Sequence, residues 1–137
     1  MTLNKPIFNI ETNDFDASIF ITDKTHNLTL SDFSVDEEIA AASLADKIYK
    51  WLKVNLNAAK IYAASLLTEL KNDTWLDENQ TPLTQTEFAE TIIFDGIIAF
   101  SEGSFQIFFY DNDIFFGHSI VVDIDKDFNF DGANISG

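Results

Sequence analysis

The sequence contains no cysteine and no arginine, and its positive side chains are eight lysines. Without cysteine the chain has no disulfide bond and no thiolate metal site. Lysine and arginine neutralise phosphates in nucleic-acid complexes, so their shortage argues against direct nucleic-acid binding. It also argues against anionic membrane surfaces, which attract basic clusters.

Long apolar runs and glycine-rich motifs are missing too. No apolar run approaches the roughly 20 residues that span a bilayer, and residues 1–6 lack the apolar segment of a signal peptide. The five glycines are scattered and form no phosphate-binding or dinucleotide-binding motif. We therefore expect a cytoplasmic protein that binds no membrane and needs no cofactor.

Hydrophobic residues make up 46% of the 137 residues, and fourteen residues are phenylalanine. A chain of this length fits one domain that buries roughly two-thirds of its unfolded surface. Each buried phenylalanine removes about 150–250 Å² from water. We predict a single domain, residues 1–137, with a phenylalanine-rich core.

Acidic residues are concentrated in the C-terminal half. Residues 77–137 carry twelve Asp and Glu against one lysine, Lys126, which is −11 of the total net charge of −15. Such a field attracts cations and basic proteins. One interpretation is therefore a basic partner, and the other is that the charge only keeps a phenylalanine-rich domain soluble.

The N-terminal part, residues 5–33, has the pattern of short strands. Pro6 suits a strand start or a sheet edge. Three apolar runs read as strands: residues 7–10, 19–21 and 28–30. The polar residues 23–27 read as a loop, and His26 falls in it near Asp23. Because one histidine and one carboxylate are too few for a zinc site, we expect His26 to be a surface residue.

Residues 36–72 have the apolar spacing of helices. Ser34 and Glu37 form a capping-box pattern. Residues 54–57 interrupt the phase, so we predict two helices, 36–53 and 57–72. Three aromatic residues of this region are expected to pack in the core rather than to form a binding box: Trp51, Tyr62 and Trp75.

A second capping box, Thr84 with Glu87, predicts a short helix over residues 85–91. Residues 92–131 have the pattern of antiparallel strands, and Gly103 can take the positive φ of a tight hairpin. Two of these strands are expected at residues 105–110 and 114–124. The predicted fold is α+β, an antiparallel β-meander packed against two main helices and one short helix.

The aromatic runs 108–110 and 115–116 place apolar side chains on both faces of the predicted strands. Two explanations are open. Either helices cover both faces of the sheet, or one face is an interaction surface.

His118 is the candidate for acid–base chemistry, because its ordinary pKa lies near neutrality. Period-2 alternation places it on the face of Ile120 and Val122, which reads as core, and Gly117 suggests a bulge. Ser119 points to the other face, so a serine–histidine pair is disfavoured. We expect a structural histidine, with catalysis or ligation as the alternative.

Asp127, Asn129 and Asp131, followed by Gly132, match the opening of a calcium-binding loop. The bidentate Glu that should follow is missing, so we expect a turn at a strand end rather than a metal site. The acidic residues near it could still attract cations weakly.

Several strings of the second half resemble an uncharacterised bacterial family, domain of unknown function 2262, over about residues 44–137. They are the helix 58–70, Asn72-Asp73-Thr74-Trp75-Leu76, Glu102-Gly103-Ser104-Phe105, Phe115-Phe116-Gly117-His118-Ser119-Ile120 and the closing residues 131–137. The string from Phe115 to Ile120 is the most specific, although Phe116 stands where tryptophan would be expected. The resemblance implies a small α+β bacterial domain and transfers no catalytic residue.

Together these patterns predict a non-enzymatic protein that captures a basic protein partner through its acidic C-terminal sheet. The predicted partner-binding residues are Asp111, Asp113, Phe115, Phe116, Asp123 and Asp125. One concrete version is an immunity-type role against a basic toxin, an analogy of class only. Two alternatives remain: an enzyme or ligand-binding domain centred on His118, and a nucleic-acid mimic whose carboxylates are spaced like phosphates.

Overall fold

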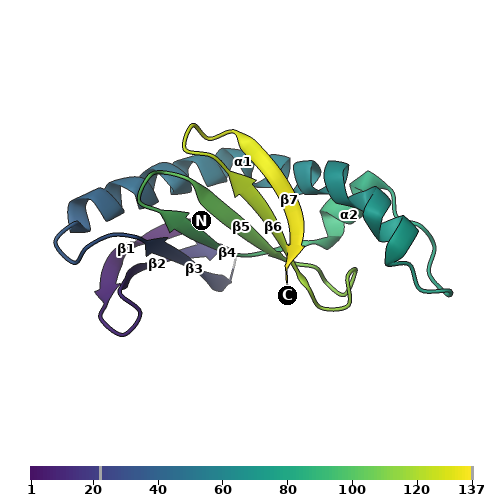
Figure 1. Ribbon diagram of the computed structural model, residues 1–137, viewed down its shortest axis with the longest axis horizontal. Coiled ribbons are helices and arrows are strands. Elements are labelled where there is room, and N and C mark those ends of the chain that lie inside the picture. Colours follow the sequence, from purple (N-terminus) through teal and green to yellow (C-terminus); the bar gives the residue numbers. More distant parts are fainter. Residues whose placement is uncertain (22, 137) are drawn as a thin grey trace.

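The computed structural model describes every residue of the chain except Thr22 and Gly137. The described residues form a seven-stranded sheet and two helices, which confirms the α+β class (Figure 1). In chain order the elements are β1 Thr2–Asn9, β2 Asp14–Ile21, β3 Lys24–Ser31, α1 Glu38–Thr74, α2 Gln85–Thr91, β4 Ile93–Phe100, β5 Phe105–Tyr110, β6 Ser119–Ile124 and β7 Phe130–Ser136.

The seven strands lie side by side in the order of the sequence. Neighbouring strands pair antiparallel except β3 and β4, which pair parallel with Leu28 opposite Ile97. A parallel pair needs a long crossover, and α1 and α2 supply it. The meander prediction therefore holds within β1–β3 and within β4–β7. The predicted end of the strand region at residue 131 was too early, since β7 extends to Ser136.

The prediction of two main helices was wrong, because α1 is one continuous helix of 37 residues, about 55 Å long. Residues 54–57 do not break its apolar face. Leu56 is half-buried between the buried Leu52 and Ala59, so the spacing continues. The side-chain amide of Asn55 donates to the Trp51 carbonyl one turn earlier, which keeps this polar residue within the helix. Neither described helix combines the length and apolar character that crossing a membrane requires.

The short helix at residues 85–91 is confirmed. Both halves of its capping box are present: the Thr84 hydroxyl accepts the Glu87 N–H at 3.1 Å, and the Glu87 carboxylate accepts the Thr84 N–H at 3.0 Å. The Ser34–Glu37 pattern is only half a box. Glu37 accepts from Ser34, but α1 begins at Glu38 with no side-chain cap.

The N-terminal strands are longer than predicted. Residues 24–27 belong to β3, so His26 lies within a strand rather than in a loop. Its ring is half-buried and contacts the ring of Phe94 at 4.9 Å. Cross-strand pairing extends the β2–β3 hairpin to Ile21 and Lys24, because backbone hydrogen bonding outweighs the polar composition of this segment.

Helices cover one face of the sheet. Figure 1 shows α1 running along the long axis of the molecule and crossing the strands. Side chains along β5 therefore alternate: Phe105, Ile107 and Phe109 are buried, whereas Phe108 is half-buried and Tyr110 exposed.

The prediction that the three large aromatics pack in the core is confirmed by their ring contacts, Trp51 with Phe105, Tyr62 with Phe130 and Trp75 with Phe115.

Candidate partner-binding face

The face of the sheet opposite α1 carries no helix among the described residues, and we call it the open face. Its centre is apolar. Phe108 on β5 lies between Gly96 on β4 and Val121 on β6, and Ile98 lies one step along β4. Gly96 has no side chain, and an added Cβ would lie 3.0 Å from the Asn27 carbonyl oxygen. Gly96 therefore contributes no side chain beside Phe108, its cross-strand neighbour.

Two shallow depressions lie on the open face, one on each side of Phe108. The first, of about 250 Å³, is lined by residues of β3 to β5, among them Asn27, Asp95 and Ile98. The second, of about 290 Å³, is lined by residues of β5 to β7, among them Val121, Asp123 and Asn134. Phe108 lines both, so it forms the ridge between them.

The charge of the open face is negative. Four aspartates lie on this side of the strands: Asp14, Asp16, Asp95 and Asp123. The carboxylate of Asp123 accepts the Gln106 amide at 3.1 Å, and that of Asp16 accepts the Asn9 amide at 3.1 Å. Both interactions hold the carboxylates in place without neutralising them.

The positive charge lies mainly on the other layer. Helix α1 carries five lysines against four acidic residues, a net charge of +1. Because the whole chain has a net charge of −15, the residues outside α1 carry −16. The one ion pair among the described residues joins Lys50 to Asp46 at 2.8 Å within α1. The helical lysines therefore leave the carboxylates of the sheet unpaired.

The structure separates the six predicted partner-binding residues. Asp123 lies on the open face, and Asp125 is half-buried in the β6–β7 turn. Asp113 and Phe116 are exposed on the loop between β5 and β6, where 58% of Phe116 is accessible. Asp111 and Phe115 are fully buried, which puts their side chains out of reach of a partner.

Asp111 organises the loop between β5 and β6. Its carboxylate accepts three backbone N–H groups, from Asp113 at 3.1 Å, Phe115 at 2.8 Å and Gly117 at 3.0 Å. Asn112, Asp113 and Phe116 have positive φ as a result, and so does Gly117. The predicted strand over residues 114–124 was therefore wrong in its first part, since β6 begins at Ser119.

His118 lies at the end of this loop, one residue before β6. Its Nδ1 atom is 2.5 Å from the Phe115 carbonyl oxygen, and its half-buried ring contacts Trp75 edge-on at 5.2 Å. The carboxylate of Asp111, seven residues earlier in the chain, is already engaged by backbone N–H groups. The imidazole thus has an aromatic and backbone environment, the arrangement of a structural histidine.

The calcium-like segment forms the turn between β6 and β7. The Asp125 carboxylate accepts the backbone N–H groups of Asn129 at 3.0 Å and Asp127 at 2.9 Å, which lowers the pKa of Asp125. Asp131 lies beyond the turn on β7. Within the described part of the chain, no three His, Asp or Glu side chains converge as a metal site.

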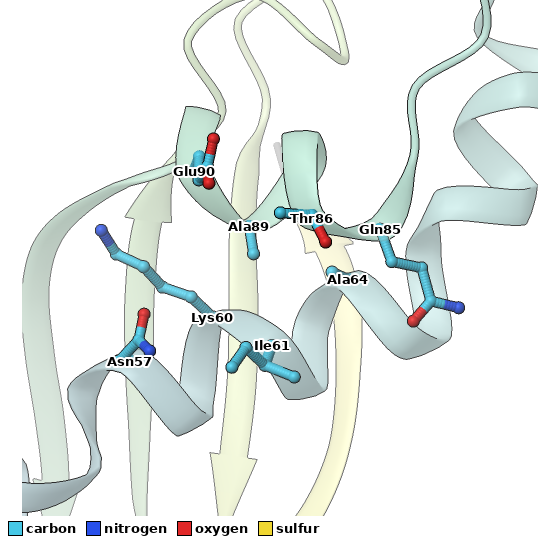
Figure 2. Close-up of a pocket in the computed structure, with 8 residues that line it drawn as sticks. All are labelled: Asn57, Lys60, Ile61, Ala64, Gln85, Thr86, Ala89 and Glu90. Atoms are coloured by element: carbon cyan, nitrogen blue, oxygen red, sulfur yellow. The ribbon is translucent and has the colours of Figure 1, made fainter.

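A groove of about 520 Å³ lies between α1 and α2 (Figure 2). Ala64 and Ala89 face each other across it, and their small side chains leave the space open. Figure 2 shows Lys60 extending toward the level of Glu90, whereas Gln85 lies at the other end beyond Ala64. The polar groups are spread along the rim rather than converging on one point, so the groove lacks the arrangement of a catalytic site.

Sequence reasoning missed the central residues of the open face, Ile98, Phe108 and Val121, and the aspartates of its N-terminal half. The available signal was the run of apolar residues on both faces of residues 105–110. Of the two explanations for that run, coverage of both faces is excluded by the position of the helices.

A family model described as "Uncharacterized protein conserved in bacteria (DUF2262)" matches residues 2–135. The match includes the N-terminal strands, whereas the sequence motifs carried the resemblance only from about residue 44. No curated protein and no solved structure matches the chain.

Proposed function

Because the chain belongs to the bacterial family DUF2262, whose description gives no activity, we propose a function from the open face: the protein binds a basic protein partner there, without catalysis. The observation that carries this proposal is the position of both helices on one side of the sheet (Figure 1). It leaves Ile98 and Phe108, both half-buried, beside the buried Val121 in the middle of an acidic face.

The apolar centre would supply most of the affinity. Energetically important interface residues cluster near the centre of a contact, where aromatic side chains are enriched. Phe108 projects between two depressions and can be enclosed by side chains of a partner. Tyr110 on the same strand is 43% exposed and adds a second aromatic at the margin.

The aspartates around this centre would select the partner by charge. Complementary charge raises the association rate and disfavours acidic partners. Because α1 carries a net charge of +1 and the rest −16, the field would also orient the approaching protein toward the sheet side. An immunity-type protein that blocks a basic toxin is one concrete form of this activity.

The two alternatives receive less support. A nucleic-acid mimic needs closely spaced charges, since DNA carries one about every 1.7 Å along its axis. Asp16 and Asp123 lie at the two ends of one cross-strand row, four strand spacings or about 19 Å apart. An enzyme centred on His118 needs a carboxylate or nucleophile beside the ring, and the ring is instead beside Trp75 and a carbonyl oxygen.

Affinity capture with salt elution tests the proposal. The immobilised protein is exposed to a lysate of its bacterial source at low salt, and bound proteins are eluted by rising salt. A variant with Asp16→Asn and Asp123→Asn should lose the captured basic protein, and Phe108→Ala should weaken its binding at least tenfold. The controls lie on α1: Asp46→Asn with Asp73→Asn matches the aspartate substitutions, and Ile61→Ala truncates an exposed apolar side chain.

Two results would count against the proposal. One is a bound protein whose affinity stays constant between low and moderate salt, because exposed charges are screened there. The other is equal loss of binding in the open-face variants and in the α1 controls. That outcome would mean that the partner does not bind specifically at the open face of the sheet.

A further inference from the structure

Lys71 is almost completely buried, with 2% of its surface exposed. The other buried charged side chain among the described residues is Asp111, and three backbone N–H groups satisfy it. The Lys71 ammonium has only two acceptors, the Trp75 carbonyl at 2.5 Å and Gln80 Oε1 at 3.0 Å. Since an ammonium has three N–H donors, one has no acceptor in the described part of the chain.

Both acceptors of Lys71 are neutral. The ion pair within α1 does not involve it, and no described carboxylate lies within ion-pair distance of its Nζ atom. Burial lowers the pKa of Lys71, and the charge of Asp77 acts in the opposite direction. A buried cation without a counter-ion costs free energy, and an anion that reached it would recover part of that cost.

Lys71 is one of the residues that line an open cleft. The cleft has a volume of about 440 Å³ and lies between the loop that follows α1 and the loop between β5 and β6. Leu83 and Ile114 give it apolar walls, and Asn79, Thr81 and Asn112 add amide and hydroxyl groups. Asp113 also lines the cleft and is exposed, and its one hydrogen-bond partner, the Tyr110 hydroxyl, is distant at 3.5 Å. The cleft therefore carries one ammonium and one carboxylate.

We propose that this cleft binds a small zwitterion of the amino-acid class. The ligand carboxylate would accept the remaining N–H of Lys71, and the ligand ammonium would lie against Asp113. Leu83 and Ile114 would contact the ligand side chain. A dianion such as phosphate fits less well, because Asp113 lines the cleft and the chain carries a net charge of −15. This site does not depend on the open face.

The test is a thermal-shift and calorimetric screen of the intact protein against the common free amino acids. At about 100 times its Kd, a binding amino acid stabilises the folded protein by about 2.7 kcal/mol, which should raise the melting temperature of a 137-residue chain by about 9 °C. For that amino acid, two analogues are then measured. The amide lacks the carboxylate and the N-acetyl form lacks the ammonium, and each should bind at least tenfold more weakly.

Two variants assign the contacts. Lys71→Met should abolish discrimination between the amino acid and its amide. Asp113→Asn should abolish discrimination between the amino acid and its N-acetyl form. Asp73→Asn, outside the cleft, is the control and should still discriminate against both the amide and the N-acetyl form. If Lys71→Met does not fold, the affinities of the wild-type protein for the two analogues and the behaviour of Asp113→Asn test the proposal instead. The proposal is overturned if no amino acid shifts the melting temperature, or if the amide binds as tightly as the acid.

Discussion

The carboxylate of Asp111 accepts the backbone N–H of Phe115 at 2.8 Å, and both residues are fully buried. This hydrogen bond turns the chain inward after β5, so that the Phe115 ring packs against Trp75 and Phe88. The adjacent Phe116, at φ 57°, is left on the surface. One buried acid thereby decides which of two neighbouring phenylalanines is core.

Replacement of Asp111 by Asn should destabilise the protein by about 2–3 kcal/mol, because the amide nitrogen cannot accept the backbone N–H groups of the loop. Urea denaturation measures the free energy of unfolding. Asp113→Asn is the matched control on the exposed side of the same loop and should change it by no more than about 0.5 kcal/mol. Equal effects would mean that the Asp111 hydrogen bonds do not stabilise the loop.

Two neighbouring phenylalanines of β5 should differ in their contribution to stability. Phe109→Ala should cost about 3–5 kcal/mol, because the ring is fully buried and packs edge-on against Phe94. Phe108→Ala should cost about 1 kcal/mol, since this half-buried ring lies on the open face. Denaturation midpoints of the two variants provide the comparison. Similar losses would show that the second face is also covered.

The continuity of α1 can be tested with proline. Ala58→Pro should cost about 3 kcal/mol or more, because proline removes a hydrogen bond within a helix and clashes with the preceding turn. In the predicted second helix, 57–72, residue 58 would instead lie in the first turn, where proline is tolerated. Gln85→Pro, at the first position of α2, is the control and should be nearly neutral. Far-ultraviolet circular dichroism and thermal melting measure both.

The capping box of α2 should contribute about 1 kcal/mol. Thr84→Ala removes the hydroxyl that accepts the Glu87 N–H, and the melting temperature should fall. Thr86→Ala, an exposed position within the same helix, should leave it unchanged or raise it slightly. A Thr84→Ala protein as stable as the Thr86→Ala protein would contradict a role for the cap.

Asp125 should give part of the stability a dependence on pH. Backbone hydrogen bonds, first from Asn129, lower its pKa in the folded state below the ordinary value of 3.8. Because the folded pKa is the lower one, the stabilisation is present above the unfolded value and disappears as the pH falls through the folded value. The difference in free energy of unfolding between wild type and Asp125→Asn should therefore be largest at neutral pH and become smaller below about pH 4. Denaturation at several pH values, with Asp127→Asn as the control, measures this difference.

Local patterns predicted several parts of the fold correctly. The Thr84–Glu87 box located α2, and the turn at Gly103 located the β4–β5 hairpin, because both depend on residues a few positions apart. The break predicted at residues 54–57 was wrong, because the continuity of the helix depends on packing against a distant part of the chain. The polar Asn55 satisfies its side chain within the helix, and packing against the sheet keeps Leu52 and Ala59 on one continuous face.

The sequence by itself determined the phenylalanine-rich core, the α+β class and the acidic charge, since these follow from composition and from the period of the apolar residues. Only the tertiary structure decided that Phe108 stays on an open face, that Asp111 is buried and that the buried Lys71 lines a cleft. Alternation along a strand separates its two faces, but which face receives a helix depends on where a crossover distant in sequence returns to the sheet. The burial of a charged side chain likewise depends on partners supplied by other segments of the fold.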